Sequence, residues 1–140
     1  MSIKKITLVG TIVFFLMNAI CIAANININN TTFEALEDLP ISEIHTKIDS
    51  INTDRGHINI AEKTIETAMQ SSSNPDIFKT KIQDWNGNDI SIKQFKTGDS
   101  VFLRAWELPD DRFLARDIYL LPKNAENIMT LPFFIEILKE

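Results

Sequence analysis

Two histidines are the residues of this sequence best suited to acid–base chemistry or metal binding. If the chain around them folds as one β-hairpin, His45 and His57 lie on adjacent strands. A catalytic centre also needs a nucleophile or a paired carboxylate within reach of the imidazole. No acidic residue is placed by the sequence to complete such a triad. We therefore interpret both histidines as solvent-facing and predict no metal site and no cofactor.

The remaining reactive residue types have local explanations. Glu37-Asp38 falls at the end of a predicted helix, and Asp110-Asp111 follows Pro109 in a predicted turn. Cys21 is the only cysteine, so no internal disulfide can form. The sequence therefore predicts that the protein is not an enzyme.

The basic residues raise the alternative of a nucleic-acid surface. Small β-barrels bind single strands through basic grooves with aromatic platforms. The side chains that could build such a face are Lys79, Lys81, Lys93, Lys96, Arg104 and Trp106. The charge opposes this interpretation: the chain carries 14 basic and 19 acidic residues. Without the first 24 residues, which hold two Lys and no acid, 12 basic residues remain against 19 acidic, a net charge of −7.

Residues 1–24 have the order of a secretory signal. Lys4 and Lys5 precede an apolar run from Ile6 to Ile20, and Ala23 and Ala24 follow it. The pattern predicts cleavage after Ala23 or Ala24 and a periplasmic mature chain. The alternative is an uncleaved segment that anchors the protein in a membrane, since about 20 apolar residues suffice to span one. Lipidation at Cys21 is not expected, because Asn18 and Ile20 depart from the lipoprotein pattern.

After this leader, residues 25–42 form an N-terminal segment with a short helix. Thr31 and Glu34 have the spacing of a capping box. Phe33, Leu36 and Leu39 fall on one helical face, and Pro40 ends it.

From residue 43 onward, apolar and polar side chains alternate with a period of two residues. Residues 43–122 are therefore expected to form the main domain, which has a mainly β fold: a small antiparallel β-barrel of five or six strands. Strands are expected at residues 43–50, 57–61, 77–84, 100–107 and 112–121, with a short strand at 64–68 after a turn at Glu62-Lys63, and Ile90 and Ile92 resume the alternation. Helix remains an open alternative for residues 61–70. Asn86-Gly87 predicts a tight hairpin turn. The side chains expected to point inward are Ile44, Ile48, Ile51, Ile58, Ile60, Phe78, Ile82, Val101, Leu103, Phe113, Ala115, Ile118 and Leu120.

Residues 123–140 form a C-terminal amphipathic helical tail. Leu131, Phe134, Ile135 and Leu138 have the spacing of one apolar face, and Phe133 and Ile137 make the tail apolar on more than one side. Two roles stay open: a lid that packs on its own domain, or a helix that docks on a protein partner. The four residues of the stripe are our candidate partner-binding residues.

The start of the mature chain carries a recognisable set of residues: Ile26-Asn27-Ile28-Asn29, Glu34, Leu36, Leu39 and Pro40. With this spacing it resembles the opening of a helix-hairpin-helix DNA-uptake domain. Such domains bind phosphate through a Gly-hydrophobic-Gly hairpin directly after the Leu-Pro. Ile41, Ser42 and Glu43 stand there, so the phosphate grip is absent from this sequence.

A longer resemblance depends on the order of several short segments: Leu36-Glu37-Asp38-Leu39-Pro40, Glu43-Ile44-His45, residues 48–51, Ile58-Asn59-Ile60, Asn86-Gly87, Phe95-Lys96-Thr97-Gly98-Asp99 and Tyr119-Leu120-Leu121-Pro122. In this order they resemble small exported proteobacterial proteins of the type IV pilus (fimbrial) biogenesis accessory family, which are encoded beside the pilus-tip adhesin. The resemblance implies a non-enzymatic periplasmic accessory that binds a protein partner during pilus assembly. A nucleic-acid-binding barrel acting in DNA uptake is the alternative function.

Overall fold

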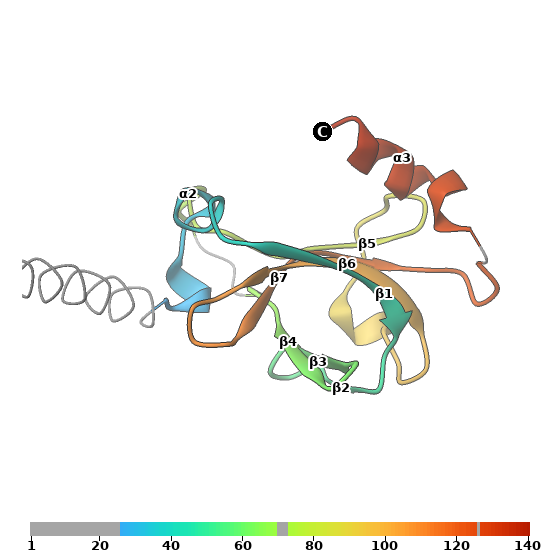
Figure 1. Cartoon of the computed structure of the whole chain (residues 1–140), viewed down its shortest axis with the longest axis horizontal. Coiled ribbons are helices and arrows are strands. Elements are labelled where there is room, and N and C mark those ends of the chain that lie inside the picture. Colours follow the sequence, from blue (N-terminus) through green and yellow to red (C-terminus); the bar gives the residue numbers. More distant parts are fainter. Residues whose placement is uncertain (1–25, 70–72, 126) are drawn as a thin grey trace, which may run out of the picture.

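The computed structural model describes residues 26–69, 73–125 and 127–140 (Figure 1). The predicted leader and Cys21 lie outside these residues. The elements, in order, are η1 (Ile28–Asn30), α2 (Phe33–Leu36), β1 (Ile41–Lys47), β2 (Ser50–Asn52), β3 (His57–Ile60), β4 (Lys63–Glu66), β5 (Lys81–Asp84), η2 (Ile92–Gln94), β6 (Ser100–Glu107), β7 (Phe113–Leu120), η3 (Ile128–Thr130) and α3 (Pro132–Leu138). No helix within the described ranges is long and apolar enough to span a membrane.

The predicted mainly β fold with a short helix near each end is confirmed. The sheet has seven strands in the order β1-β6-β7-β4-β3-β2, and β5 pairs with β7 beside this path. It differs from the expected antiparallel barrel of five or six strands, because it is open and because β4 and β5 both run parallel to β7.

The two ends of the open sheet are joined by the chain itself. β1 pairs with β6 and β2 pairs with β3, and only Ile48-Asp49 separates the two strands. The Ile48 N–H donates to Asp99 O at 2.9 Å, whereas the Asp49 N–H donates to Asn59 O at 2.9 Å. The single strand expected over residues 43–50 is therefore a bent ribbon that leaves one edge of the sheet and enters the other.

The β6–β7 hairpin forms the centre of the sheet. Ala105 faces Ala115, but Arg104 faces Asp117, so Arg116 is an extra residue on β7 and forms a β-bulge. On β7, β4 pairs with Phe113 and Leu114, and β5 pairs with residues 117–120. The bulge therefore lies between the partners that β7 has on this edge.

The inner face of this hairpin carries the main core. Of the side chains predicted to point inward, Ile48, Ile58, Ile60, Ile82, Val101, Leu103, Ala115 and Ile118 are buried. Ile44, Ile51, Phe113 and Leu120 are partly buried and pack against this core, while Phe78 packs against the cluster around Trp106. The two-residue period therefore predicted the inward side chains correctly except for Phe78, which does not join the main core.

The segment after Asn86-Gly87 does not form the expected returning strand. Gly87 adopts a positive φ of 84°, and the carboxylate of Asp84 closes the turn by accepting the Asn86 and Asn88 N–H groups at 2.9 and 3.0 Å. Ile92 and Phe95 then lie three residues apart, with Ile92 in η2, and both are buried in the main core. A 3₁₀ turn with this spacing buries both side chains on one side, which a strand could not do.

Residues 61–70 contain a strand rather than the alternative helix. β3 and β4 form a hairpin around Ala61 and Glu62, which have φ values of 46° and 65°. Positive φ at both central positions is typical of a type I′ turn, which favours Asn-Gly. Neither Ala61 nor Glu62 is a residue type that indicates such a turn. The turn was therefore predicted one residue too late, at Glu62-Lys63.

The N-terminal helix is shorter than expected and begins one residue later. Thr32 rather than Thr31 is the cap, since its hydroxyl accepts the Ala35 N–H at 3.3 Å. Thr31 instead accepts the Phe78 N–H on its backbone oxygen at 2.7 Å, which ties the segment to the chain before β5.

Replacing Ala61-Glu62 by Asn-Gly should stabilise the protein. Asn and Gly occupy the left-handed region with less strain than Ala and Glu, so we expect the free energy of unfolding to rise by about 1 kcal/mol. Urea denaturation followed by circular dichroism measures it. Lys63→Gly, at the first residue of β4, is the control and should destabilise, because a glycine in a strand adds entropy to the unfolded chain and relieves no strain there. Equal losses in both variants would contradict the turn assignment.

Candidate functional site

The outer face of the β6–β7 hairpin carries three cross-strand pairs in a row. Trp106 lies opposite Leu114, Arg104 opposite Asp117, and Phe102 opposite Tyr119. The apolar pair at one end packs with Ile28 and Leu36 of the N-terminal segment, and the pair at the other end packs with α3. Figure 1 shows α2 and α3 on the same side of this part of the sheet, at opposite ends, while β2, β3 and β4 lie on the other side.

Between the two apolar pairs lies a buried ion pair. The Arg104 Nε donates to both Asp117 carboxylate oxygens, at 2.9 and 3.0 Å, and its Nη2 also donates to Asp117. A second carboxylate, Glu140, accepts from Arg104 Nη2 at 3.2 Å. Burial alone would lower the pKa of Arg104, but Asp117 and Glu140 outweigh it and raise the pKa above its ordinary value. The guanidinium of Arg104 is therefore always charged, and its Nε and Nη2 groups are hydrogen-bonded to Asp117 and Glu140.

The neighbouring phenol is also held in one state. Tyr119 is 1% exposed, and burial, reinforced by the Asp117 carboxylate, raises its pKa to about 12. A phenol of that pKa stays protonated at neutral pH, so it is unsuited to act as a base or a nucleophile.

The C-terminal helix α3 is fixed to this face by its own aromatic side. Phe133 is 2% exposed and stacks on Tyr119, with ring centroids 4.4 Å apart. Phe134 meets Phe102 edge-to-face at 5.7 Å, and Ile137 packs against the same cluster. The tail therefore covers its own domain, as a lid does.

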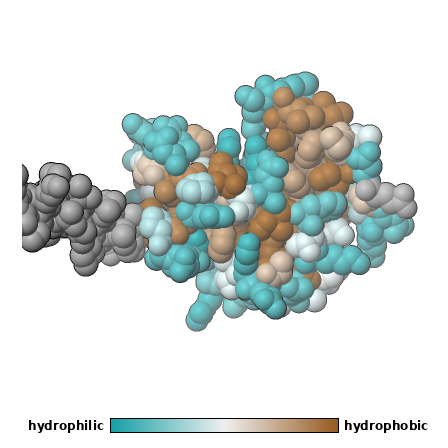
Figure 2. Space-filling view, viewed as in Figure 1, coloured by the Kyte–Doolittle hydropathy of each residue, from teal (hydrophilic) through white to brown (hydrophobic). Residues whose placement is uncertain are grey.

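The four residues of the predicted stripe separate into two pairs. Leu131 and Phe134 are partly buried against the cluster around Phe102 and Tyr119. Ile135 and Leu138 are exposed, at 45% and 68%. Met129 in η3 is exposed as well, and Figure 2 shows hydrophobic residues gathered at the α3 end of the molecule. α3 thus presents a second apolar side to its surroundings.

A groove runs along α3 on the side of β5. Its volume is about 660 Å³, and its lining includes Lys81, Gln83, Gly87, Tyr119 and Ile137. Lys81 Nζ lies 6.0 Å from the Tyr119 ring centroid. The lining is mixed, because the apolar side chains of Phe133 and Ile135 stand beside the ionisable groups of Glu136, Lys139 and Glu140.

The histidines lie apart from each other, contrary to the single hairpin that we expected. His45 is exposed on β1 opposite Phe102, whereas His57 is on β3 opposite Glu66. The sequence missed Glu66 as a partner because the β3–β4 turn was placed one residue too late. The His57 Nε2 lies 3.4 Å from Glu66 Oε1, and Arg112 Nη1 lies 3.8 Å from Glu66 Oε2.

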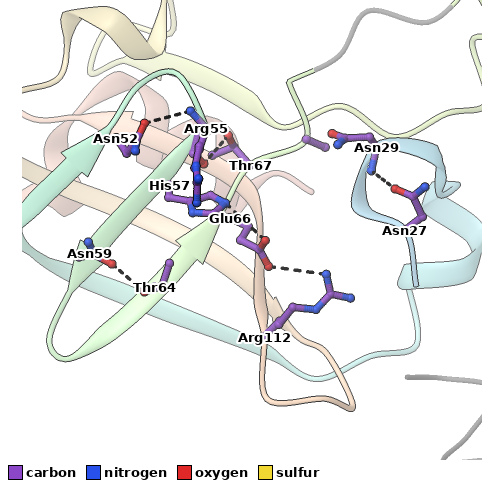
Figure 3. Close-up of polar contacts among 12 residues, drawn as sticks. Asn27, Asn29, Asn52, Arg55, His57, Asn59, Thr64, Glu66, Thr67 and Arg112 are labelled. Carbon is purple, nitrogen blue, oxygen red and sulfur yellow. Dashed lines mark hydrogen bonds and ion pairs between the residues drawn. The ribbon is translucent and has the colours of Figure 1, made fainter. Parts of the chain in front are cut away.

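These groups line a polar recess of about 440 Å³ between the β3–β4 hairpin and the N-terminal segment (Figure 3). Arg112 also bonds Asp110 Oδ2 through Nε at 2.6 Å and Ile26 O through Nη2 at 2.7 Å. The Thr67 hydroxyl, which lines the recess too, donates to Gly56 O at 2.8 Å. Arg112 therefore ties the start of the described chain to β4 through Glu66, and the Thr67 hydroxyl holds the residue before β3.

No group of three or more His, Cys, Asp or Glu that could hold a metal ion occurs within residues 26–69, 73–125 and 127–140. The basic face that the nucleic-acid alternative requires is not formed as a whole. Lys79, Lys81, Lys93 and Lys96 are exposed, but Arg104 is 7% exposed and Trp106 is 0% exposed. Neither the guanidinium nor the indole that the face needs can reach a nucleic acid.

No protein-family model, curated protein or solved structure matches the chain.

Removing one partner of the buried ion pair should destabilise the fold strongly. Asp117→Asn leaves Arg104 charged and mostly buried, so we expect a loss of about 3 kcal/mol in the free energy of unfolding. Urea denaturation measures it. Glu140→Gln is the control. Because the Glu140 side chain is half exposed, this substitution should lower the free energy of unfolding by less than about 1 kcal/mol. The double variant Arg104→Met with Asp117→Leu should recover most of the loss; a wild-type stability for Asp117→Asn alone would refute this account.

The two sides of α3 should respond differently to substitution. Phe133→Ala removes a buried ring and should cost about 3 kcal/mol or more. Ile135→Asp with Leu138→Asp changes only exposed positions and should change the free energy of unfolding by no more than about 1 kcal/mol. Thermal denaturation distinguishes the two. A large loss in the exposed pair would show that this side also packs on the domain.

Proposed function

We propose that the protein is a non-enzymatic periplasmic accessory factor that binds another protein during type IV pilus (fimbrial) biogenesis. The observation that carries the binding role is α3. One side of this helix is fixed to the sheet through Phe133, while Ile135 and Leu138 face outward. A rigidly held helix with outward apolar side chains is a recurring way to engage a protein partner.

The setting of the proposal comes from the sequence. The leader at residues 1–24 has the features of an export signal, and the segments between Leu36 and Pro122 resemble the pilus accessory family. The net charge of −7 after the leader also favours a protein partner over a polyanion.

Two observations support a role without catalysis. The His57 imidazole has a carboxylate beside it, but the Thr67 hydroxyl of the same recess already donates to a backbone oxygen. Burial raises the pKa of the Tyr119 phenol to about 12, which makes its deprotonated form harder to reach than that of an ordinary tyrosine. Neither arrangement provides an activated nucleophile.

The alternative function, nucleic-acid binding in DNA uptake, receives less support. The burial of Arg104 and Trp106 removes the cation and the ring best placed to stack bases. This alternative predicts salt-dependent retention of single-stranded DNA by the exported protein.

Deletion of the gene should lower surface piliation and twitching. Complementation with the wild-type gene should restore both, whereas Ile135→Asp with Leu138→Asp should not, because two carboxylates on the outward side of α3 oppose burial against a partner. Sheared-pilus blots and twitching zones measure the outcome, with protein levels checked in parallel.

Lys93→Asp is the matched control. It changes the net charge by the same two units, and Lys93 is exposed in η2, away from α3. It should complement fully. Normal piliation in the deletion strain would end the pilus proposal, and full complementation by the α3 double variant would remove α3 as the binding surface.

A further inference from the structure

The strand β1 is an unpaired edge of the sheet. It pairs with β6 on one side, and in the described part of the chain no strand pairs with its other side. It spans seven residues without a proline or a bulge. An edge of this kind is a template for a further strand.

The alternation of the β1–β6 ladder decides which backbone groups are free. Just before β1, the Glu107 N–H donates to Pro40 O. Just after β1, the Ile48 N–H donates to Asp99 O. The even-numbered residues at both ends of β1 therefore bond towards β6. Directly opposed residues in an antiparallel ladder alternate between bonded and non-bonded pairs. The N–H and C=O groups of Ile41, Glu43, His45 and Lys47 therefore point to the free side.

The sequence of β1 complements itself when it is read against a second copy in the opposite direction. With Ile44 on the axis, Glu43 lies opposite His45, Ile41 opposite Lys47, and Ser42 opposite Thr46. The acid thus meets an imidazole that can donate to it, the lysine stem covers an isoleucine that is 41% exposed, and the two hydroxyl residues face each other.

The same register satisfies the backbone. Bonded pairs must join odd-numbered residues to odd-numbered residues, and the pairs Ile41–Lys47 and Glu43–His45 do so on both sides of the axis. Full overlap of the two strands would form about eight backbone hydrogen bonds. The register with Ile44 on the axis therefore meets both requirements, the side-chain matching and the backbone alternation, over the full length of β1.

We propose that two copies of this chain pair through β1, antiparallel and in this register, so that the two sheets become one continuous sheet across a twofold axis. The interface is isologous: each strand supplies to its partner what it receives. It is also small, so the dimer should be weak and concentration-dependent. The proposal does not depend on a role in pilus biogenesis or on α3.

The charge arrangement gives the first test. His45→Glu places carboxylates at positions 43 and 45 of both strands, and each repulsion occurs twice across the axis. We expect the dissociation constant of the dimer to rise at least tenfold. Exchanging the two residues, Glu43→His with His45→Glu, restores an acid opposite an imidazole without changing composition, and should return the constant to within about threefold of wild type.

Sedimentation equilibrium measures the constant at neutral pH on the full chain, expressed with its own leader and purified as the cell processes it. Concentrations should reach about 1 mM, because a weak edge-to-edge dimer is expected. A monomer at every concentration overturns the proposal. A dimer that is equally strong in His45→Glu also overturns it, because that dimer uses another surface.

The backbone gives the second test. Glu43→Pro removes an N–H that points to the free side, so the β1–β6 ladder stays intact and the chain should remain folded but monomeric. Ile44→Pro is the matched control: it removes an N–H bonded to β6 and should lower the melting temperature. A dimer of wild-type strength in folded Glu43→Pro would refute the β1 pairing.

Discussion

The buried Arg104–Asp117 pair constrains most of the molecule. Two charges leave water here, and the free energy of that transfer is offset only while the pair keeps its geometry and its surroundings stay dry. The dryness comes from both ends of the described chain: η1 and α2 cover Trp106 on one side of the pair, and α3 covers Phe102 and Tyr119 on the other. The N-terminal segment and α3 therefore shield the same Arg104–Asp117 pair from opposite sides, although the pair belongs to the central hairpin.

The same pair fixes the register of the central hairpin. A shift of β6 by one residue along β7 would bring Arg104 opposite Arg116 or Ile118 and would turn Trp106 towards the inner face. The extra residue Arg116 adjusts the phase of β7, so that Ala115 and Ile118 both face the inner core while Asp117 faces outward. The bulge thus lets one strand serve an apolar core on one side and a charged pair on the other.

Much of this fold could be predicted from the sequence, because the inner core follows a two-residue period in β3 and β6 and departs from it in β7 only at the bulge. The alternation in Ile58-Asn59-Ile60 and around Leu103 indicated both the strands and their inward side chains. The Leu131–Leu138 spacing indicated the C-terminal helix, although its buried side is the one marked by Phe133 and Ile137.

What could not be predicted depends on contacts distant in sequence or on turns without a signature. The type I′ turn at Ala61-Glu62 lacks Asn and Gly, and the one-residue error there hid the His57–Glu66 pair. The parallel pairing of β4 and β5 with β7 has no local pattern at all. The Arg104–Asp117 pair was missed for a different reason: isolated charges in a strand usually indicate solvent, and only the covering helices make these two buried.

The bent ribbon of β1 and β2 has a consequence for how the chain reaches this structure. β6 and β7 are adjacent in sequence and can form their ladder early, whereas β1 must find β6 across more than fifty intervening residues, and such loop closure slows folding. Until it arrives, one side of β6 is an open template, and Ile48-Asp49 cannot connect the two ends of the sheet. Pairing of β1 then connects the ends of a sheet that β4 and β7 already hold together, and conditions that delay this pairing leave the edge of β6 exposed to incorrect association.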